Sequence, residues 1–177
     1  MGKELVVTVF GSSRPREGDA DYEEARILGR ALARHGFSVC SGGYGGVMEA
    51  VSRGAKEASG RTVGVTADFF KNAKLNPWVD EEVRLQTWEE RLFELIRRAD
   101  AFVACKGGTG TLVELAVVWE MLNKTVMSAK PFAVLGSSGG RYWIACGKLS
   151  WGIRRHGARP MGGWCMQQRR PAMWPII

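Results

Sequence analysis

The stretch AFVACKGGTGTLVELAVVWEML, from Ala101 to Leu122, decides the fold. It begins as an apolar run of strand length, passes through the glycine-rich turn Lys106–Thr111 and ends in a run of helical length. Glycines in such a turn let the backbone approach a ligand closely, and the free N–H groups and dipole of the following helix favour an anion. The unit therefore predicts a phosphate site, and a tight turn without a ligand is the alternative.

The same alternation of strand and helix extends through the first 135 residues. Strands are predicted at Leu5–Phe10, Phe37–Cys40, Thr62–Thr66, Ala101–Cys105 and Phe132–Leu135, mostly from apolar runs. Glu82–Leu85 is a candidate for a further short strand. Helical spacing predicts helices at Asp21–His35, Val47–Ala58, Thr87–Arg98 and Thr111–Leu122. Strands that are apolar on both faces and alternate with helices are typical of a parallel sheet. We expect one nucleotide-binding α/β domain over residues 1–136, built as a three-layer, Rossmann-like parallel sheet with helices on both faces.

Three loops follow strands at the edge of the sheet where ligands of parallel sheets bind, beyond the carboxyl ends. They are residues 11–14, 42–46 and 107–111, and all are rich in Gly, Ser or Thr. The expected phosphate- and nucleotide-binding residues are Gly11, Ser12, Ser13, Gly42, Gly43, Gly107, Gly108, Thr109, Gly110 and Thr111. Neither glycine turn has the spacing of a dinucleotide-binding fingerprint or of a Walker A loop.

Two charged residues near the turn are candidates for chemistry. Glu114 lies close to the expected phosphate, where a carboxylate could bind ribose hydroxyls or stabilise a developing sugar cation. Its alternative is a capping box with Thr111, three residues earlier. Arg91 lies in the preceding helix, and its alternative is a solvated surface arginine among neighbouring glutamates.

Other kinds of site are disfavoured by composition. The two histidines, one at a helix end and one in the C-terminal segment, argue against a Ser-His-Asp triad. The four cysteines form no C-x-x-C pair and join no histidine cluster, which argues against zinc. We therefore expect no metal, and buried reduced thiols at Cys40 and Cys105.

The chain has 177 residues, 45% apolar and 24% charged, as is usual for a soluble globular protein. No apolar run approaches the ~20 residues of a membrane span. The first apolar run is too short for the core of a signal peptide. We expect a cytoplasmic protein with no membrane partner.

Residues 137–177 differ from the rest of the chain. None of the 18 acidic residues lies beyond Glu120, so the net charge of +7 arises in the C-terminal part. This segment also holds Trp143, Trp151, Trp164 and Trp174 of the 7 tryptophans, and its pattern indicates neither an amphipathic helix nor an alternating strand. We interpret it as an atypical, poorly packed basic tail and expect no nucleic-acid partner. A reading-frame shift near codon 136 is favoured over a genuine basic appendage, and translating the gene in the other frames tests this.

These motifs together resemble the LOG family, the cytokinin riboside 5′-monophosphate phosphoribohydrolases formerly labelled lysine decarboxylase-like. The family motif P-G-G-x-G-T-x-x-E is matched by Lys106–Glu114. Arg91 lies at the place of the family arginine, before the Ala99-Asp100-Ala101 start of the strand, and the opening Val9–Ser13 and the loop Gly42–Met48 are also similar. The resemblance covers residues 5 to 135.

The resemblance implies an N-glycosidase that splits a nucleoside 5′-monophosphate such as AMP into free base and ribose 5-phosphate, as in cytokinin biosynthesis. It implies Arg91 and Glu114 as the catalytic pair, no cofactor, and a homodimer. A non-catalytic carrier of a nucleotide or of the molybdenum cofactor on the same fold is the alternative. Three residues depart from the family pattern, Lys106 for Pro, Val113 for the first Glu of a pair and Leu92 for Lys, and they leave the exact substrate open.

Overall fold

The structure is a computed structural model that describes residues 4–135 and the backbone of residues 141–146, 149–154 and 165–168. The strands are β1 Val6–Phe10, β2 Ser38–Ser41, β3 Thr62–Ala67, β4 Glu81–Leu85, β5 Ala101–Ala104, β6 Phe132–Val134, β7 Arg141–Cys146, β8 Leu149–Arg154 and β9 Cys165–Gln168. The helices are α1 Ala20–Arg34, α2 Val47–Glu57, α3 Trp88–Arg98 and α4 Thr109–Asn123.

The strands form a single sheet in the order β4-β3-β2-β1-β5-β6-β7-β8-β9. The first six are parallel, as the sequence predicted. β1 lies between β2 and β5, so the order of the strands reverses on the two sides of β1. Such a reversal opens a crevice beyond the carboxyl ends of the two strands, where ligands of this kind of sheet bind. The loops after β1 and β5 therefore border the expected site.

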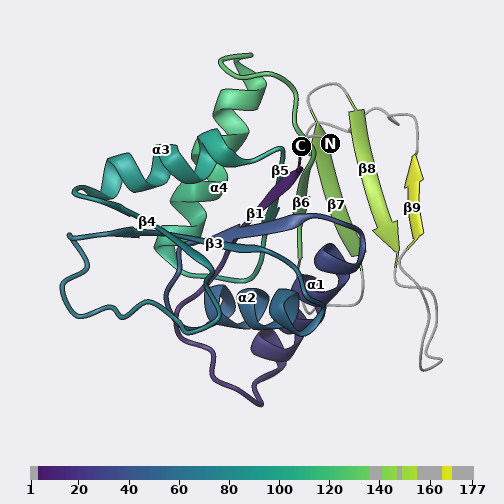
Figure 1. Ribbon diagram of the computed structural model, residues 1–177. Helices are drawn as coiled ribbons and strands as arrows, with labels where there is room; N and C mark the ends of the chain where they lie inside the picture. Colours follow the sequence, from purple (N-terminus) through teal and green to yellow (C-terminus); the bar gives the residue numbers. More distant parts are fainter. Residues whose placement is uncertain (1–3, 136–140, 147–148, 155–164, 169–177) are drawn as a thin grey trace.

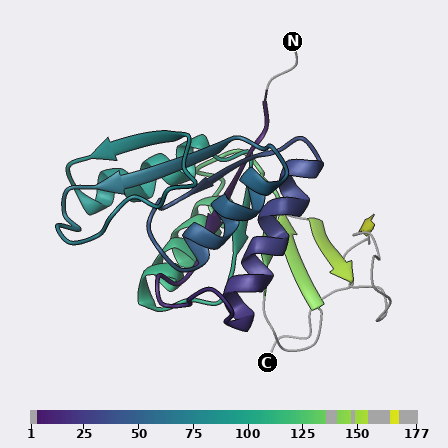
Figure 2. The same cartoon turned by 60° about the horizontal axis from the view of Figure 1, so that its bottom comes forward.

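Helices cover both faces of the parallel part. Figure 1 shows α1 and α2 on one face and α3 and α4 on the other, and Figure 2 shows the same layers from a second direction. One buried cluster joins the sheet to α1 and α2 and includes Val9, Tyr22 and Val51. A second cluster joins it to α3 and α4 and includes Leu95 and Val118. The predicted three-layer α/β architecture is confirmed.

Beyond β6 the strands of the sheet pair in antiparallel fashion. β7, β8 and β9 are antiparallel to their neighbours, and the β7–β8 hairpin pairs Cys146 with Leu149. The expectation that no strand follows residue 135 is therefore wrong. The three segments are short, and β7 and β8 carry Trp and Ile, which favour strands without needing a regular alternation. This pairing does not test the proposed frame shift, which stays a prediction. The predicted poor packing of the C-terminal segment also stays a prediction, because the side chains of that segment lie outside the described part of the structure.

In the part of the chain that the structure describes, no helix is both long enough and apolar enough to span a membrane.

Candidate functional site

Arg91 is a buried arginine in the first turn of α3. This helix begins at a capping box, in which Glu90 N donates to Thr87 Oγ1 at 3.2 Å and Thr87 N donates to a Glu90 carboxylate oxygen at 3.0 Å. The side chain of Arg91 points into the protein, where its Nε donates to the carbonyl oxygen of Val65 at 2.8 Å. Only 5% of Arg91 is exposed, so the alternative of a solvated surface arginine is wrong.

Glu114 lies beside Arg91 and does not cap its own helix. α4 begins at Thr109 with Gly108 as its N-cap, two residues earlier than the sequence predicted, so Thr111 is already inside the helix and the capping-box alternative is wrong. A carboxylate oxygen of Glu114 lies 3.7 Å from a terminal nitrogen of Arg91, and 14% of the Glu114 side chain is exposed. The structure thus brings the two predicted catalytic residues together from different helices.

The environment shifts the pKa of both groups. Burial raises the pKa of Glu114 to about 7, and the charge of Arg91 opposes this only in part. Burial lowers the pKa of Arg91, opposed by Glu114, but a guanidinium stays protonated near neutral pH. Glu114 therefore exchanges a proton near neutrality while a fixed positive charge stands next to it, a combination suited to acid–base chemistry.

The raised pKa has a measurable consequence for stability. Above pH ~4.5 the folded state still holds a proton on Glu114, whereas the unfolded chain has lost it. The protonated carboxyl therefore contributes fully to the free energy of unfolding at low pH, and this contribution is lost as pH rises through about 7. We expect the wild type to lose about 2–3 kcal/mol relative to Glu114→Gln between pH 5 and pH 8. Urea unfolding of both proteins at the two pH values measures this. An equal difference at both values would show that the pKa is not raised.

Aromatic and sulfur groups enclose the guanidinium of Arg91. Its Cζ lies 5.5 Å from the ring centre of Tyr44 and 5.4 Å from that of Phe70, and a terminal nitrogen lies 3.9 Å from Met48 Sδ. Sequence reasoning missed Tyr44 and Phe70 as site residues. For Tyr44 the sequence offered one indirect signal, its position within the second glycine loop. For Phe70 it offered none.

The three predicted ligand loops are joined to one another. Ser12 N donates to the carbonyl oxygen of Lys106 at 3.3 Å, which ties the first loop to the third. Val47 N donates to the carbonyl oxygen of Ser12 at 2.8 Å, which ties the second loop to the first. The Ser12 hydroxyl accepts from Arg14 N at 3.1 Å, and the carbonyl oxygen of Ser13 accepts from Arg16. The loops therefore form one continuous edge of the sheet.

The third loop is shaped for close approach to a ligand. Residues 107–110 are exposed, whereas Thr111 is buried. A Cβ on Gly107 would lie 2.1 Å from Thr111 Oγ1, so only glycine fits there. Backbone N–H groups at the start of a helix, with room in front of them, suit a phosphate. The binding roles of Gly107, Gly108, Thr109, Gly110 and Thr111 stay predictions.

Lys106 replaces the Pro of the family motif and brings a positively charged side chain to the glycine turn. Its Nζ lies 3.0 Å from a carboxylate oxygen of Asp21 in α1, and the side chain is exposed. This contact offsets much of the lysine's charge near the turn. The substitution of Lys for Pro therefore changes the local electrostatics less than an unpaired lysine would.

The described residues contain no cluster of three or more His, Cys, Asp or Glu side chains able to hold a metal ion. Cys40 and Cys105 are buried free thiols, as predicted, and burial raises the pKa of each to about 12. Such thiols are poor nucleophiles at neutral pH. The catalytic roles of Arg91 and Glu114 stay predictions.

Comparison with known proteins shows which family the chain resembles. The model of the SLOG cluster4 family matches residues 4–139. The cytokinin riboside 5′-monophosphate phosphoribohydrolase of Mycobacterium marinum is 33% identical over 147 residues, covering 79% of this chain and 77% of that protein. An uncharacterized protein of Archaeoglobus fulgidus is 32% identical over 121 residues, covering 67% and 78%.

Similar solved structures point to a second kind of relative. The molybdenum cofactor binding protein of Rippkaea orientalis superposes with a TM-score of 0.64 at 28% identity, covering 77% of this chain and 78% of that one. The molybdenum cofactor carrier protein of Chlamydomonas reinhardtii superposes with a TM-score of 0.58 at 25% identity, covering 77% and 80%.

Proposed function

The chain belongs to the SLOG cluster4 family, and on that premise we propose that it hydrolyses the N-glycosidic bond of a nucleoside 5′-monophosphate, such as AMP or a cytokinin riboside 5′-monophosphate. The observation that carries the proposal is the buried Arg91–Glu114 pair, 3.7 Å apart, near a glycine turn that opens a helix. The relative from M. marinum is named for this activity.

The 5′-phosphate binds at the N-terminus of α4 in this proposal. The backbone N–H groups of residues 107–111 face an anion there, and the helix dipole adds to the attraction. Holding the phosphate fixes the ribose relative to Glu114, which lies in the second turn of the same helix. Binding energy from the phosphate, remote from the reacting bond, then positions the sugar for reaction.

The bond that breaks joins C1′ of the ribose to the nitrogen of the base. The leaving nitrogen takes the bonding electron pair, and C1′ passes through an oxocarbenium-like state that the carboxylate of Glu114 stabilises. The oxygen of a water molecule then bonds to C1′, and one proton of that water passes to Glu114, whose pKa of about 7 suits the transfer. Glu114 then gives this proton to the leaving nitrogen, which completes the free base and restores the carboxylate. Arg91 balances negative charge on the leaving base. The products are free base and ribose 5-phosphate.

Gly42 tests whether the position of Arg91 matters. A Cβ at this residue would lie 1.7 Å from a terminal nitrogen of Arg91 and 2.6 Å from Met48 Sδ, so Gly42→Ala must displace the guanidinium. We expect kcat/KM for AMP to fall by about 10²-fold, the cost of misplacing a catalytic group by about 1 Å. Gly45→Ala is the matched control, because its nearest contact is 3.7 Å away. Equal activity of the two variants would contradict a role for the position of Arg91.

Substrate comparison tests the proposed function. We expect free base from AMP and from isopentenyl-AMP, and none from adenosine at the same concentration, because adenosine lacks the phosphate that fixes the ribose. Chromatography of the products after incubation measures this. Equal release from adenosine would show that the glycine turn contributes no phosphate binding.

A carrier of the molybdenum cofactor is the second candidate, favoured by the solved structures from R. orientalis and C. reinhardtii. A carrier needs the phosphate-binding edge of the sheet but no reactive pair. The buried, pKa-shifted Arg91–Glu114 pair favours the enzyme. Binding of AMP without release of base would favour the carrier.

We also propose that the protein forms a homodimer through α4. Leu112, Ala116 and Trp119 lie on one face of α4 at helical spacing and are exposed, Trp119 by 47%. An apolar face of this kind on a surface helix is typical of an interface. A second copy that covers α4 would also exclude water from the helix that carries Glu114.

Trp119→Glu tests the dimer. We expect the wild type to elute as a dimer in size-exclusion chromatography with light scattering, and Trp119→Glu as a monomer, because a charge buried in an apolar interface is costly. Ile27→Glu is the control, since Ile27 is exposed on α1, which covers the opposite face of the sheet. A dimeric Trp119→Glu variant would exclude this face as the interface.

A further inference from the structure

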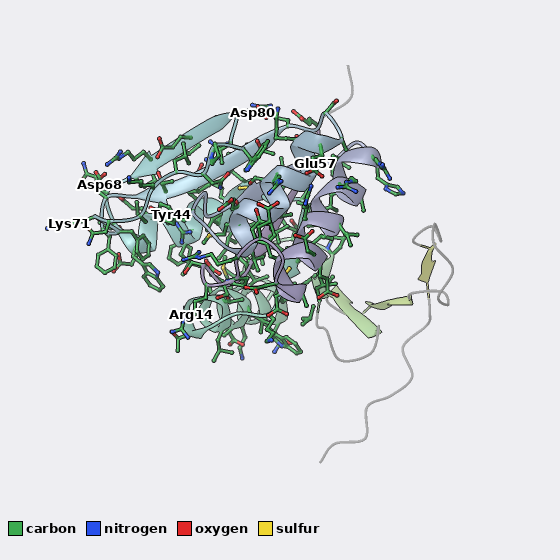
Figure 3. All side chains as sticks on the ribbon, turned by 90° about the horizontal axis from the view of Figure 1, so that it is seen from below. Arg14, Tyr44, Glu57, Asp68, Lys71 and Asp80 are labelled. Carbon is green, nitrogen blue, oxygen red and sulfur yellow. The ribbon has the colours of Figure 1, made fainter. Side chains whose placement is uncertain are left out.

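The loop between β3 and β4 places Phe70 next to Arg91 and Phe69 next to Phe70. We call residues 68–76 the aromatic loop. It follows β3 at the carboxyl edge of the sheet, the edge that also carries the glycine loops. Figure 3 shows Asp68 and Lys71, two members of this loop, close to Tyr44 at one end of the molecule.

The rings of the aromatic loop continue the wall that begins at Tyr44. Phe70 lies 5.6 Å from Tyr44 between ring centres, in an edge-to-face arrangement, and 5.4 Å from Arg91 Cζ. Phe69 lies 5.2 Å from Phe70, again edge to face. Phe70 is half-buried, whereas 65% of Phe69 is exposed. The wall therefore runs from the catalytic arginine outward to the surface.

Hydrogen bonds fix both ends of the loop to the second glycine loop. The Tyr44 hydroxyl accepts from Ala67 N at 2.9 Å and donates to Ala67 O at 3.1 Å, just before the loop begins. At its end, the side-chain amide of Asn76 donates to the carbonyl oxygens of Gly43 and Tyr44 at 3.0 and 3.1 Å, and Asn76 N donates to Gly43 at 2.8 Å. The position of the rings relative to Arg91 is therefore set by the fold.

We propose that Phe70 and Phe69 form the base-binding wall of the site, with Phe70 in contact with the purine ring and Phe69 in contact with an apolar substituent on its exocyclic nitrogen. The inference rests on the proposed function and deepens it. A planar base gains most from an aromatic neighbour, and an exposed ring beside that neighbour gains from an apolar group that covers it. With phosphate at α4 and base at the aromatic loop, the glycosidic bond lies between them, next to Arg91 and Glu114.

Phe70→Leu tests contact with the base. Leucine keeps apolar volume over Arg91 but removes the ring, so we expect KM for AMP to rise about tenfold while kcat and thermal stability change little. A purely structural role would lower kcat and the melting temperature through Arg91 and leave KM unchanged, and this result would overturn the proposal. Phe93→Leu is the matched control, since Phe93 is an exposed phenylalanine of α3 outside the wall.

Phe69→Ser tests contact with the substituent. We expect the wild type to prefer isopentenyl-AMP to AMP, and the ratio of their kcat/KM values to fall about fivefold in Phe69→Ser. An unchanged ratio, or a wild type that prefers AMP, would overturn this assignment.

Binding measurements separate the wall from the proposed reaction. If the wild type binds AMP in calorimetry but releases no base, the proposed function fails and the wall is judged by Kd alone, which should rise about tenfold in Phe70→Leu. An unchanged Kd would overturn the wall in that case. No AMP binding by the wild type would overturn both.

Discussion

Replacing Glu114 with glutamine is expected to lower kcat for release of adenine from AMP by about 10³-fold and to leave AMP binding within a few-fold of the wild type. Glutamine has nearly the same shape but neither the negative charge that stabilises the sugar cation nor the ability to take a proton from water. The phosphate site at the start of α4 is unaltered, so binding survives. Single-turnover kinetics and calorimetry measure the two quantities separately.

Glu120→Gln is the matched control for this experiment. Glu120 lies on the same helix, is exposed, and forms an ion pair with Lys124 at 3.8 Å. We expect wild-type kcat from it. A Glu114→Gln variant that keeps more than about a tenth of wild-type kcat would remove Glu114 from the chemistry, since loss of a general base costs at least about 10²-fold.

Replacing Arg91 with methionine is expected to have the second-largest effect, a fall in kcat/KM of about 10²- to 10³-fold. Methionine fills similar space but leaves the carbonyl oxygen of Val65 without its donor and removes the charge beside Glu114. Arg91 holds the pKa of Glu114 down against the effect of burial. Without that charge, the pKa of Glu114 rises further above about 7.

The pH profile distinguishes loss of this charge from simple damage to the fold. If Glu114 must be ionised, wild-type kcat rises with pH through about 7, and the residual activity of Arg91→Met rises at a higher pH. Arg97→Met is the control, because Arg97 is exposed and pairs with Glu94. An acid limb at the same pH in Arg91→Met and wild type would contradict electrostatic coupling between Arg91 and Glu114.

The parallel part of the sheet could be predicted because its signals are local. Most strands through β6 are short, largely apolar runs, and most helices end at a glycine or begin at a capping residue such as Thr87. The family followed from the same motifs, and the SLOG cluster4 match confirms it. The start of α4 was misplaced because Thr111 resembles an N-cap in sequence, although the backbone turns into the helix at Gly108.

Contacts between distant segments could not be read from the sequence. Arg91 looked like a surface residue because glutamates surround it in sequence, but the amphipathic face of α3 turns it towards Val65. The side-chain amide of Asn76 is buried and donates to two carbonyl oxygens of the second glycine loop, a contact that no local pattern predicts. The strands beyond residue 135 were not predicted, because they are defined by pairing with neighbouring strands and show no alternation of apolar and polar residues.

The most direct test of the central claim is the identity of the products that the wild-type protein forms from AMP. We predict adenine and ribose 5-phosphate in equal amounts, with no adenosine and no inorganic phosphate, because the bond cut is the one between base and ribose. Chromatography of a completed reaction measures all four compounds together. AMP that stays intact while bound, or its conversion to adenosine and phosphate, would contradict the account.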